Sequence, residues 1–279
     1  MRIWLGTRSG GRLVDADQAR VSVLDHGFTV ADGVFETLRV TRAGPFALSR
    51  HLRRLCESAA VLDLPAPDLS VVQDAVDTVV GAWWSDGGSL GRLRVTYTAG
   101  AAPLGSGRGA GEPTLVVAVA SAEPWPETTS AVTVPWTRNE GSAVAGAKTT
   151  SYAENVVALR RAHEQGSSEA LLANTRGELC EGTGTNVFVV HDGRLLTPPL
   201  TSGCLPGITR ELVLEWFGGE EVDLPMSALH EADEVLLTSS TRDVHPVVRL
   251  DDRQWDEAGP VGLRLRAEFA ALAAEQIDP

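Results

Sequence analysis

The first half of the chain alternates between hydrophobic and polar positions, a pattern that predicts β-strands. Residues 34–40 alternate with a period of two, which places Phe35, Thr37 and Arg39 on one face and the intervening side chains on the other. The same reading predicts further strands at 3–5, 12–14, 90–98 and 114–120.

Apolar residues three or four positions apart predict two helices among these strands. The buried face of the first is marked by the leucines of residues 48–55 and by Ala59, with Ser49 as its expected N-cap. The second is expected over residues 69–84. Residues 100–111 are rich in glycine and predict a mobile loop.

In the second half of the chain, segments with helical spacing alternate with segments that have the period of two typical of strands. Ser151, followed three residues later by Glu154, predicts a capping box at the start of a helix that ends near Gly166. Further strands are expected at 131–136, 169–173, 187–190, 194–197 and 232–237, and further helices at 205–216 and 261–276.

A proline-rich segment separates the two halves. Residues 123–127 read Glu-Pro-Trp-Pro-Glu, and the two prolines stiffen the backbone where the composition changes. We therefore expect a small N-terminal domain over residues 1–120, a linker over 121–128 and a larger C-terminal domain over 129–279.

Composition narrows the class of protein. The net charge of −13 and the pI of about 4.9 argue against nucleic acid and anionic membranes as partners. The three cysteines have no metal-binding spacing and suit a reducing compartment, so we expect a cytoplasmic protein without a metal site. The N-terminus lacks the apolar stretch of a signal peptide, and no apolar run reaches membrane-spanning length.

One lysine stands out among the charged residues. Of the 24 basic side chains only Lys148 is a lysine, and it is the only charged residue in 142–151. A primary amine can lose its proton in an apolar pocket and condense with an aldehyde, which a guanidinium cannot do. The alternative is a last surface lysine in an arginine-rich composition, but surface lysines usually have charged neighbours.

Several further residues suit the binding of an anion. Arg39 shares a strand face with an aromatic residue and a threonine, and could bind a carboxylate or simply be solvated. Arg94 lies on a second strand face beside Arg92, and Arg108 lies in the glycine-rich loop. A helix start preceded by Gly207 also suits an anion, although many junctions of this kind have no ligand.

Six blocks of the sequence follow one another in a characteristic order: Asp32-Gly-Val-Phe-Glu-Thr-Leu-Arg39, His51-Leu-Arg-Arg54-Leu, Lys148, Cys180-Glu-Gly-Thr-Gly-Thr-Asn186-Val-Phe, Leu205-Pro-Gly-Ile-Thr209-Arg and, as a sixth, the stretch from Ala232 to Pro246. Taken together, these blocks resemble the class IV aminotransferase family, the fold-type IV enzymes that use pyridoxal 5′-phosphate (PLP). The family includes branched-chain and D-amino-acid transaminases, (R)-amine transaminases and aminodeoxychorismate lyases.

The resemblance implies a role for each matching residue. Lys148 is the lysine that binds PLP covalently and acts as general acid and base. Glu181 matches the acid that keeps the pyridine nitrogen protonated. Four residues match the phosphate ligands of the family: the side chains of Arg54 and Ser240, and the backbone amides of Ile208 and Thr209.

The sequence departs from the family in two places. Several branched-chain enzymes carry a tyrosine five residues after the lysine, where this chain has Ala153, so we interpret the neighbouring Tyr152 as a packing residue. D-amino-acid transaminases carry a substrate-binding arginine after the Val-Thr that Val95-Thr96 resembles, where this chain has Tyr97. Arg39, Arg94 and Arg108 remain as alternatives for the substrate carboxylate.

The fold implied by the resemblance is a two-domain α+β architecture with PLP at the domain junction, in a homodimer whose N-terminal domain completes the pocket of its partner. The implied function is transamination between an amino acid, including a D-amino acid or an (R)-amine, and a 2-oxo acid such as pyruvate or 2-oxoglutarate. The alternatives are a 4-amino-4-deoxychorismate lyase and a non-catalytic PLP-binding protein. A mobile Arg108 would predict weak activity on an (R)-amine beside a preferred amino acid.

Overall fold

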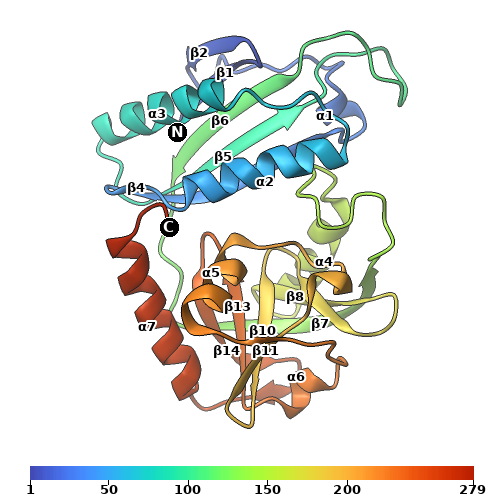
Figure 1. Ribbon diagram of the computed structural model, residues 1–279, viewed down its shortest axis with the longest axis vertical. Coiled ribbons are helices and arrows are strands. Elements are labelled where there is room, and N and C mark those ends of the chain that lie inside the picture. The colour runs from blue at the N-terminus through green and yellow to red at the C-terminus, as the bar shows by residue number, and fades with distance from the viewer. The chain divides into compact units, whose positions relative to one another are not determined.

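The computed structural model describes residues 1–279, which divide into two compact units (Figure 1). Unit 1 comprises residues 1–124, 147–151 and 276–279, and unit 2 comprises residues 125–146 and 152–275. The main boundary falls within the predicted linker. Two short segments that the sequence assigned to the second domain, 147–151 and 276–279, lie in unit 1.

Unit 1 contains a six-stranded antiparallel sheet with the strand order β2-β1-β6-β5-β3-β4. Its strands are β1 (Arg2–Thr7), β2 (Gly10–Val14), β3 (Gly33–Thr41), β4 (Gly44–Pro45), β5 (Gly91–Thr98) and β6 (Thr114–Ser121). Its helices are α1 (His26–Thr29), α2 (Leu48–Val61) and α3 (Leu69–Ser85).

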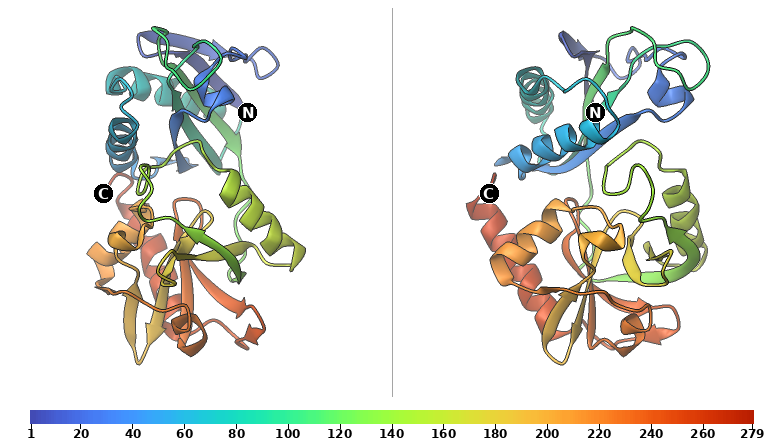
Figure 2. Two further views of the ribbon diagram at one scale, coloured as in Figure 1. Left: turned by 90° about the vertical axis from the view of Figure 1, so that its right-hand side faces the viewer. Right: turned by 45° about the vertical axis from the view of Figure 1, so that its right-hand side comes forward.

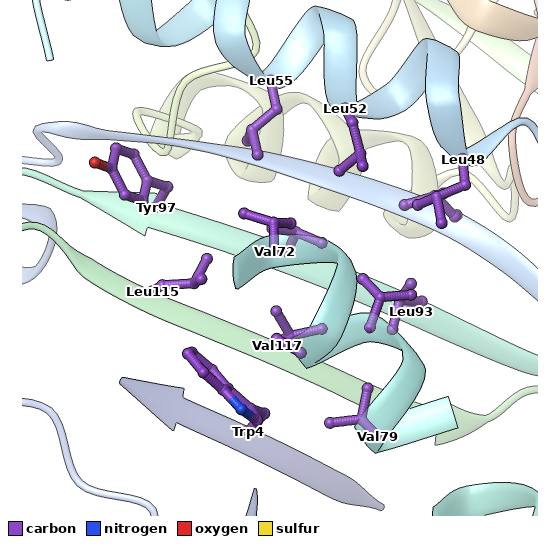
Figure 3. Packing of buried hydrophobic residues seen from close by; sticks show 14 of the residues in the cluster. Trp4, Leu48, Leu52, Leu55, Val72, Val79, Leu93, Tyr97, Leu115 and Val117 are labelled. Atoms are coloured by element: carbon purple, nitrogen blue, oxygen red, sulfur yellow. The ribbon is translucent and has the colours of Figure 1, made fainter. Parts of the chain in front are cut away.

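The core of unit 1 lies between the sheet and the helices α2 and α3 (Figure 3). The alternation predicted for β3 is confirmed, because Val34, Leu38 and Val40 are fully buried in this core. Leu52 and its neighbours on α2 supply the facing apolar side chains, as the helical spacing predicted. The opposite face of β3 therefore presents its other side chains away from the core.

Unit 2 contains a mixed nine-stranded sheet with the order β12-β11-β10-β13-β14-β7-β8-β9, and β15 pairs with β14. The pairs of β7 with β8, β7 with β14 and β11 with β12 are parallel. The strands are β7 (Thr129–Arg138), β8 (Glu169–Asn174), β9 (Leu179–Gly182), β10 (Asn186–His191), β11 (Arg194–Thr197), β12 (Glu220–Glu221), β13 (Glu234–Ser239), β14 (Asp243–Leu250) and β15 (Arg253–Gln254). The helices are α4 (Ala153–Glu164), α5 (Ile208–Phe217), α6 (Ala228–Glu231), α7 (Pro260–Glu275) and the short 3₁₀ helix at Leu200–Ser202.

Helices cover the sheet of unit 2 at several places. Helix α4 packs on β7 and β8 through small side chains such as Ala158 and Ala162, which contact Val132 and Leu172. Helix α5 packs on β13, and α7 runs along β13 and β14 (Figure 2). No helix of the protein combines the length and the apolar character that a membrane crossing requires.

Two predicted helix caps were wrong. Helix α2 begins after Ala47, and Ser49 lies inside it, where the amide and hydroxyl of Ser49 donate to Asp278 Oδ1 at 2.9 Å each. Helix α4 has Tyr152 as its N-cap, without a side-chain hydrogen bond, so the capping box of Ser151 does not form. In α2 the capping carboxylate comes from a residue far away in the sequence.

Candidate active site

Lys148 belongs to a short segment that is hydrogen-bonded to the first residues of β3. The amide of Phe35 donates to the carbonyl of Lys148 at 3.0 Å, and the amide of Thr150 donates to Gly33 at 2.8 Å. On its other side, the amide of Lys148 donates to Ser58 Oγ, on α2, at 3.0 Å. The backbone of the lysine is therefore fixed by a strand and a helix of unit 1.

The side chains of Lys148 and Arg94 meet at one aromatic ring. Lys148 Nζ lies 4.5 Å from the centre of the Phe35 ring, and the guanidinium carbon of Arg94 lies 3.7 Å from the same centre. A cation near an aromatic face is attracted by the ring quadrupole. Phe35 thus places a primary amine and a fixed cation within reach of one small molecule.

Other arginines share this outer face of the sheet. Arg39 on β3 lies directly opposite Arg92 on β5, and Arg94 lies opposite Thr37 in the same register. The Nε of Arg94 donates to Thr96 Oγ1 at 3.3 Å. Like charges directly opposite each other on two strands repel, so an anionic ligand on this face would relieve the repulsion.

Arg54 is held in a buried ion pair. Its Nε and Nη2 donate to the two carboxylate oxygens of Glu36 at 2.8 and 2.7 Å. His51 Nδ1 lies 2.6 Å from the same carboxylate, and all three side chains are buried. The pair fixes the plane of the guanidinium.

The electrostatics of this cluster favour the ionised carboxylate. Burial alone would raise the pKa of Glu36, but the charges and hydrogen bonds of Arg54 and His51 outweigh it and lower the pKa to about 2. Burial lowers the pKa of His51, since a charged imidazole would lose its hydration there. Glu36 therefore stays charged throughout the physiological pH range.

Arg108, expected in a mobile loop, makes four hydrogen bonds. Its Nε and Nη2 donate to the carboxylate of Asp32 at 2.7 and 2.6 Å. Its Nη2 and Nη1 also donate to the carbonyls of Leu62 and Asp63 at 2.5 and 2.7 Å. The hydrogen bonds from Arg108 to its carboxylate lower the pKa of Asp32. In this structure the guanidinium is fixed by protein groups.

In unit 2, a backbone amide and an arginine contact the carboxylate of Glu181. Its Oε2 accepts a hydrogen bond from the amide of Leu205 at 2.9 Å, and its Oε1 lies 3.0 Å from Arg138 Nε. Arg138 also donates to Asn155 Oδ1 at 3.1 Å. Sequence reasoning missed Arg138, since an arginine at the end of a strand carries no local signal of a carboxylate partner.

The blocks that contain Glu181 and Gly207 are joined at one residue, Leu205. While Glu181 binds the amide of Leu205, Asn186 Nδ2 donates to the carbonyl of the same residue at 2.9 Å. A Cβ on Gly207 would lie 1.9 Å from Asn186 Oδ1, so only glycine fits there. The Glu-Gly-Thr-Gly-Thr-Asn loop therefore fixes the entry to α5.

The loop itself is held by a buried carboxylate that sequence reasoning also missed. Glu169 accepts hydrogen bonds from the amide of Thr183 at 2.9 Å and from the hydroxyl of Thr185 at 3.1 Å. The side chain of Glu169 is almost fully buried. It sets the path of the loop between Glu181 and Asn186.

The remaining predicted residues of unit 2 lie at the same end of its sheet. Ile208 and Thr209 form the first turn of α5, whose amides have no acceptor within the helix. Ser240 follows β13, and Thr238 of that strand pairs with Asn186. The structure thus brings Glu181, the α5 N-terminus and the Ser240 turn together around Asn186.

Each unit, taken by itself, has groups that suit a part of PLP by their chemistry. Unit 1 has the amine of Lys148 and the guanidinium of Arg54, and unit 2 has the Glu181 carboxylate and the amides that begin α5. An aldehyde, a phosphate and a pyridine nitrogen need an amine, a cation with amide donors and an acid, respectively.

Comparison with known proteins identifies the family. A family model described as amino-transferase class IV matches residues 33–250. This span covers more than half of the chain, and the protein belongs to the class IV aminotransferases. The resemblance seen in the sequence is confirmed.

Similar proteins cover nearly the whole chain. It is 32% identical to a putative branched-chain-amino-acid aminotransferase of Methanocaldococcus jannaschii, over 96% of this chain and 95% of that protein. It is also 32% identical to the bifunctional aminodeoxychorismate lyase / D-amino acid transaminase of Mycobacterium tuberculosis, over 88% of each. A solved structure of a hypothetical aminotransferase from Mycobacterium tuberculosis in its PLP-bound form matches with a TM-score of 0.83 and 29% identity, over 98% of this chain and 99% of that chain.

The expected fold and cofactor are confirmed as well. The structure contains helices and strands in two units, each with its own sheet, as in the fold-type IV transaminases. Class IV aminotransferases depend on PLP, so the protein is a PLP-dependent enzyme.

Proposed function

We propose that this enzyme moves an amino group between an amino acid and a 2-oxo acid such as pyruvate or 2-oxoglutarate. The observation that carries the proposal is the ring of Phe35, which is contacted by the amine of Lys148 and by the guanidinium of Arg94. A substrate with an amino group next to a carboxylate has complementary partners at this ring. A simple amine would leave the cation unpaired.

Different residues of the chain have different roles in such a reaction. Bound PLP supplies an aldehyde that condenses with amines and a ring that accepts electrons. Lys148 Nζ takes the α-proton of the amino donor in the first half of the reaction. In the second half it delivers a proton to the α-carbon of the new amino acid. Glu181, aimed by the amide of Leu205, presents a carboxylate to the pyridine nitrogen, and Arg54 presents a guanidinium to the phosphate.

Of the three arginines proposed for the substrate carboxylate, Arg94 has the best support. It shares an aromatic ring with Lys148, and Arg39 lies on the neighbouring strand of the same outer face. Arg108 instead uses its donors on Asp32 and on two carbonyls. A fixed strand arginine favours amino acids over simple amines, which removes the basis for expecting activity on an (R)-amine.

A second candidate is the cleavage of 4-amino-4-deoxychorismate to pyruvate and 4-aminobenzoate. A relative that is 32% identical is named as both a lyase of this kind and a D-amino acid transaminase. The substrate carries carboxylates that suit the arginine-lined face. The non-catalytic alternative is disfavoured, because the enzyme retains Lys148, Glu181 and Arg54 in ordered surroundings.

We further infer that the enzyme is a cytoplasmic homodimer. Large apolar side chains are exposed in both units: Val23 and Phe28 are 74% and 75% exposed in unit 1, and Val156 is 64% exposed in unit 2. Several exposed apolar side chains close together, as in residues 21–30 of unit 1, are typical of surfaces that a partner covers. The three unpaired cysteines suit a reducing compartment. Sedimentation of the purified enzyme would test the dimer.

A panel of substrates tests the proposed reaction. Purified enzyme with PLP would be offered L-leucine, D-alanine and (R)-phenylethylamine, each with pyruvate or 2-oxoglutarate, and separately aminodeoxychorismate. We expect turnover of at least one amino acid and a much lower rate with the amine. Release of 4-aminobenzoate without any amino transfer would replace the proposal with the lyase. Lys148→Ala is the inactive control.

A further inference from the structure

The segment that carries Lys148 is attached to the residues on either side of Asp32. The hydroxyl of Thr150 donates to the carbonyl of Ala31 at 2.9 Å, and the amide of Thr150 donates to the carbonyl of Gly33 at 2.8 Å. The position of the lysine backbone therefore depends on the path of residues 31–33.

That path is strained. Ala31 has a φ of 57°, in the left-handed region that residues with a Cβ avoid at a cost of roughly 1 kcal/mol or more. A conformation of this kind persists only where surrounding contacts impose it. The backbone of Asp32 supplies part of them, since its amide donates to His26 and its carbonyl accepts from Ala99.

The side chain of Asp32 adds further contacts, with His26 Nδ1 at 3.5 Å and with Arg108. The guanidinium binds both carboxylate oxygens and also the carbonyls of Leu62 and Asp63, where α2 ends. Cations are favoured at the C-terminus of a helix because of its partial negative charge. Arg108 therefore ties the start of β3 to the end of α2.

These two elements are the same two that hold the lysine. Ser58 lies in the last part of α2 and accepts the amide of Lys148, while Gly33 begins β3 and accepts the amide of Thr150. Arg108 thus closes a ring of contacts that runs from the lysine segment through α2 and Asp32 back to the segment.

We propose that Arg108 and Asp32 are positioning residues for Lys148, and that their ion pair keeps the two supports of the lysine segment at a fixed spacing. The inference rests on the proposed function only in taking Lys148 as the reacting amine. In this role Arg108 does not contact the substrate. Its loss changes the rate with every substrate, whether or not the substrate has a carboxylate.

Hydrogen–deuterium exchange tests the structural part directly, without turnover. The protein would be compared, with and without PLP, to Arg108→Gln, Arg108→Lys, Asp32→Asn and the double variant. We expect the amides of Lys148 and Thr150 to exchange about tenfold faster in each single variant, as loss of a charge-assisted pair permits local opening. Arg12→Gln, an exposed arginine of the same unit, is the matched control and should not change this exchange.

The double variant separates coupling from two independent effects. If Arg108 and Asp32 act as one pair, Asp32→Asn combined with Arg108→Gln should exchange no faster than either single variant. Circular dichroism and the melting temperature show whether each variant folds. Arg108→Lys keeps the charge and serves where Arg108→Gln does not fold.

Kinetics distinguish positioning from substrate binding. A positioning role predicts a lower kcat with little change in KM in both single variants, and a shifted pH dependence of the absorbance of the lysine–PLP bond. A substrate ligand predicts a higher KM for carboxylate substrates in Arg108→Gln and none of these changes in Asp32→Asn. That second pattern, or unchanged exchange at Lys148, would overturn the proposal. An enzyme without transaminase activity that still shows the exchange effect would instead count against the proposed function alone.

Discussion

Arg54 and Glu36 form a two-pronged ion pair with N–O distances of 2.8 and 2.7 Å, although Glu36 comes from the face of β3 that builds the hydrophobic core. A buried charge is costly unless its partner and hydrogen bonds are in place. Here both the guanidinium and His51 satisfy the carboxylate. The pair links a strand of the core to the arginine proposed to bind phosphate.

The first prediction concerns the stability of this pair. The pKa of Glu36 is about 2 in the folded protein, compared with an ordinary value of 4.5 that applies to the unfolded chain. The ionised carboxylate therefore contributes stability above pH 4.5, and this stability is lost as the pH falls toward 2. We expect Glu36→Gln to lower the free energy of unfolding by roughly 3 kcal/mol at pH 7 and by much less at pH 2.5. Denaturant titrations at the two pH values measure this.

An exposed pair of the same unit provides the control. Glu57 lies beside Arg53 on the surface of α2, and Glu57→Gln should change the free energy of unfolding by less than about 1 kcal/mol at either pH. Equal decreases in the free energy of unfolding of the two variants would show that the buried pair stabilises the fold no more than the exposed pair does.

The second prediction concerns the covalent link to the cofactor. Lys148→Ala should bind PLP without a covalent bond and lose nearly all turnover, because no other lysine exists in the chain. Borohydride reduction followed by peptide mass spectrometry should find PLP on the peptide containing Lys148. The label on any other peptide would disprove the assignment.

The third prediction concerns the acid of unit 2. Glu181→Gln retains the shape of the side chain and removes its charge, so we expect bound PLP and a kcat lower by about 10²-fold or more. Absorbance spectra report the retained cofactor, and steady-state kinetics report the rate. Turnover equal to that of the unmodified enzyme would remove Glu181 from the mechanism.

The fourth prediction concerns the phosphate. Arg54→Ala removes a charge-assisted hydrogen bond of about 1.5–3 kcal/mol, which corresponds to a PLP affinity lower by roughly 10- to 100-fold. The rate at saturating PLP should fall less than the affinity. Arg53→Ala, at the adjacent exposed position on α2, is the matched control and should bind PLP normally. The reverse result would move the phosphate contact to Arg53.

The fifth prediction concerns the substrate carboxylate. Arg94→Ala should raise KM for the amino acid and the oxo acid by about 10- to 100-fold, since it removes the cation beside Phe35. Arg39→Ala tests the neighbouring strand in the same assay, and Arg12→Ala is the control. If KM changes only in the Arg39 variant, the carboxylate lies on β3 and not on β5.

Local patterns explain which parts of the fold could be predicted. The alternation in β3 follows from burial on one face, so Val34 and Leu38 lie in the core as expected. The cap of α2 could not be predicted, because the group that binds Ser49 is Asp278, at the other end of the sequence. Strand β14 was missed because Pro246 interrupts a pattern that otherwise suits a strand.

In the candidate site, too, some features could be predicted from the sequence and others could not. The motif blocks supplied the residue types, and the roles of Lys148 and Glu181 stay predictions until they are measured. The partners that orient these residues, such as Arg138 and Asp32, could not be predicted, because an ion pair between distant positions leaves no periodic trace in the sequence. Family resemblance supplied roles, while only the structure supplied partners.

The return of residues 147–151 to unit 1 limits how this enzyme can be recombined with its relatives. A chimera joined at residue 125 would take its lysine segment from one parent and the strand and helix that hold it from the other. Ser58, Gly33 and Thr150 would then meet foreign neighbours at the reacting amine. A chimera that exchanges specificity between family members should therefore take residues 147–151 from the same parent as the N-terminal portion, and not from the parent that supplies the surrounding sequence.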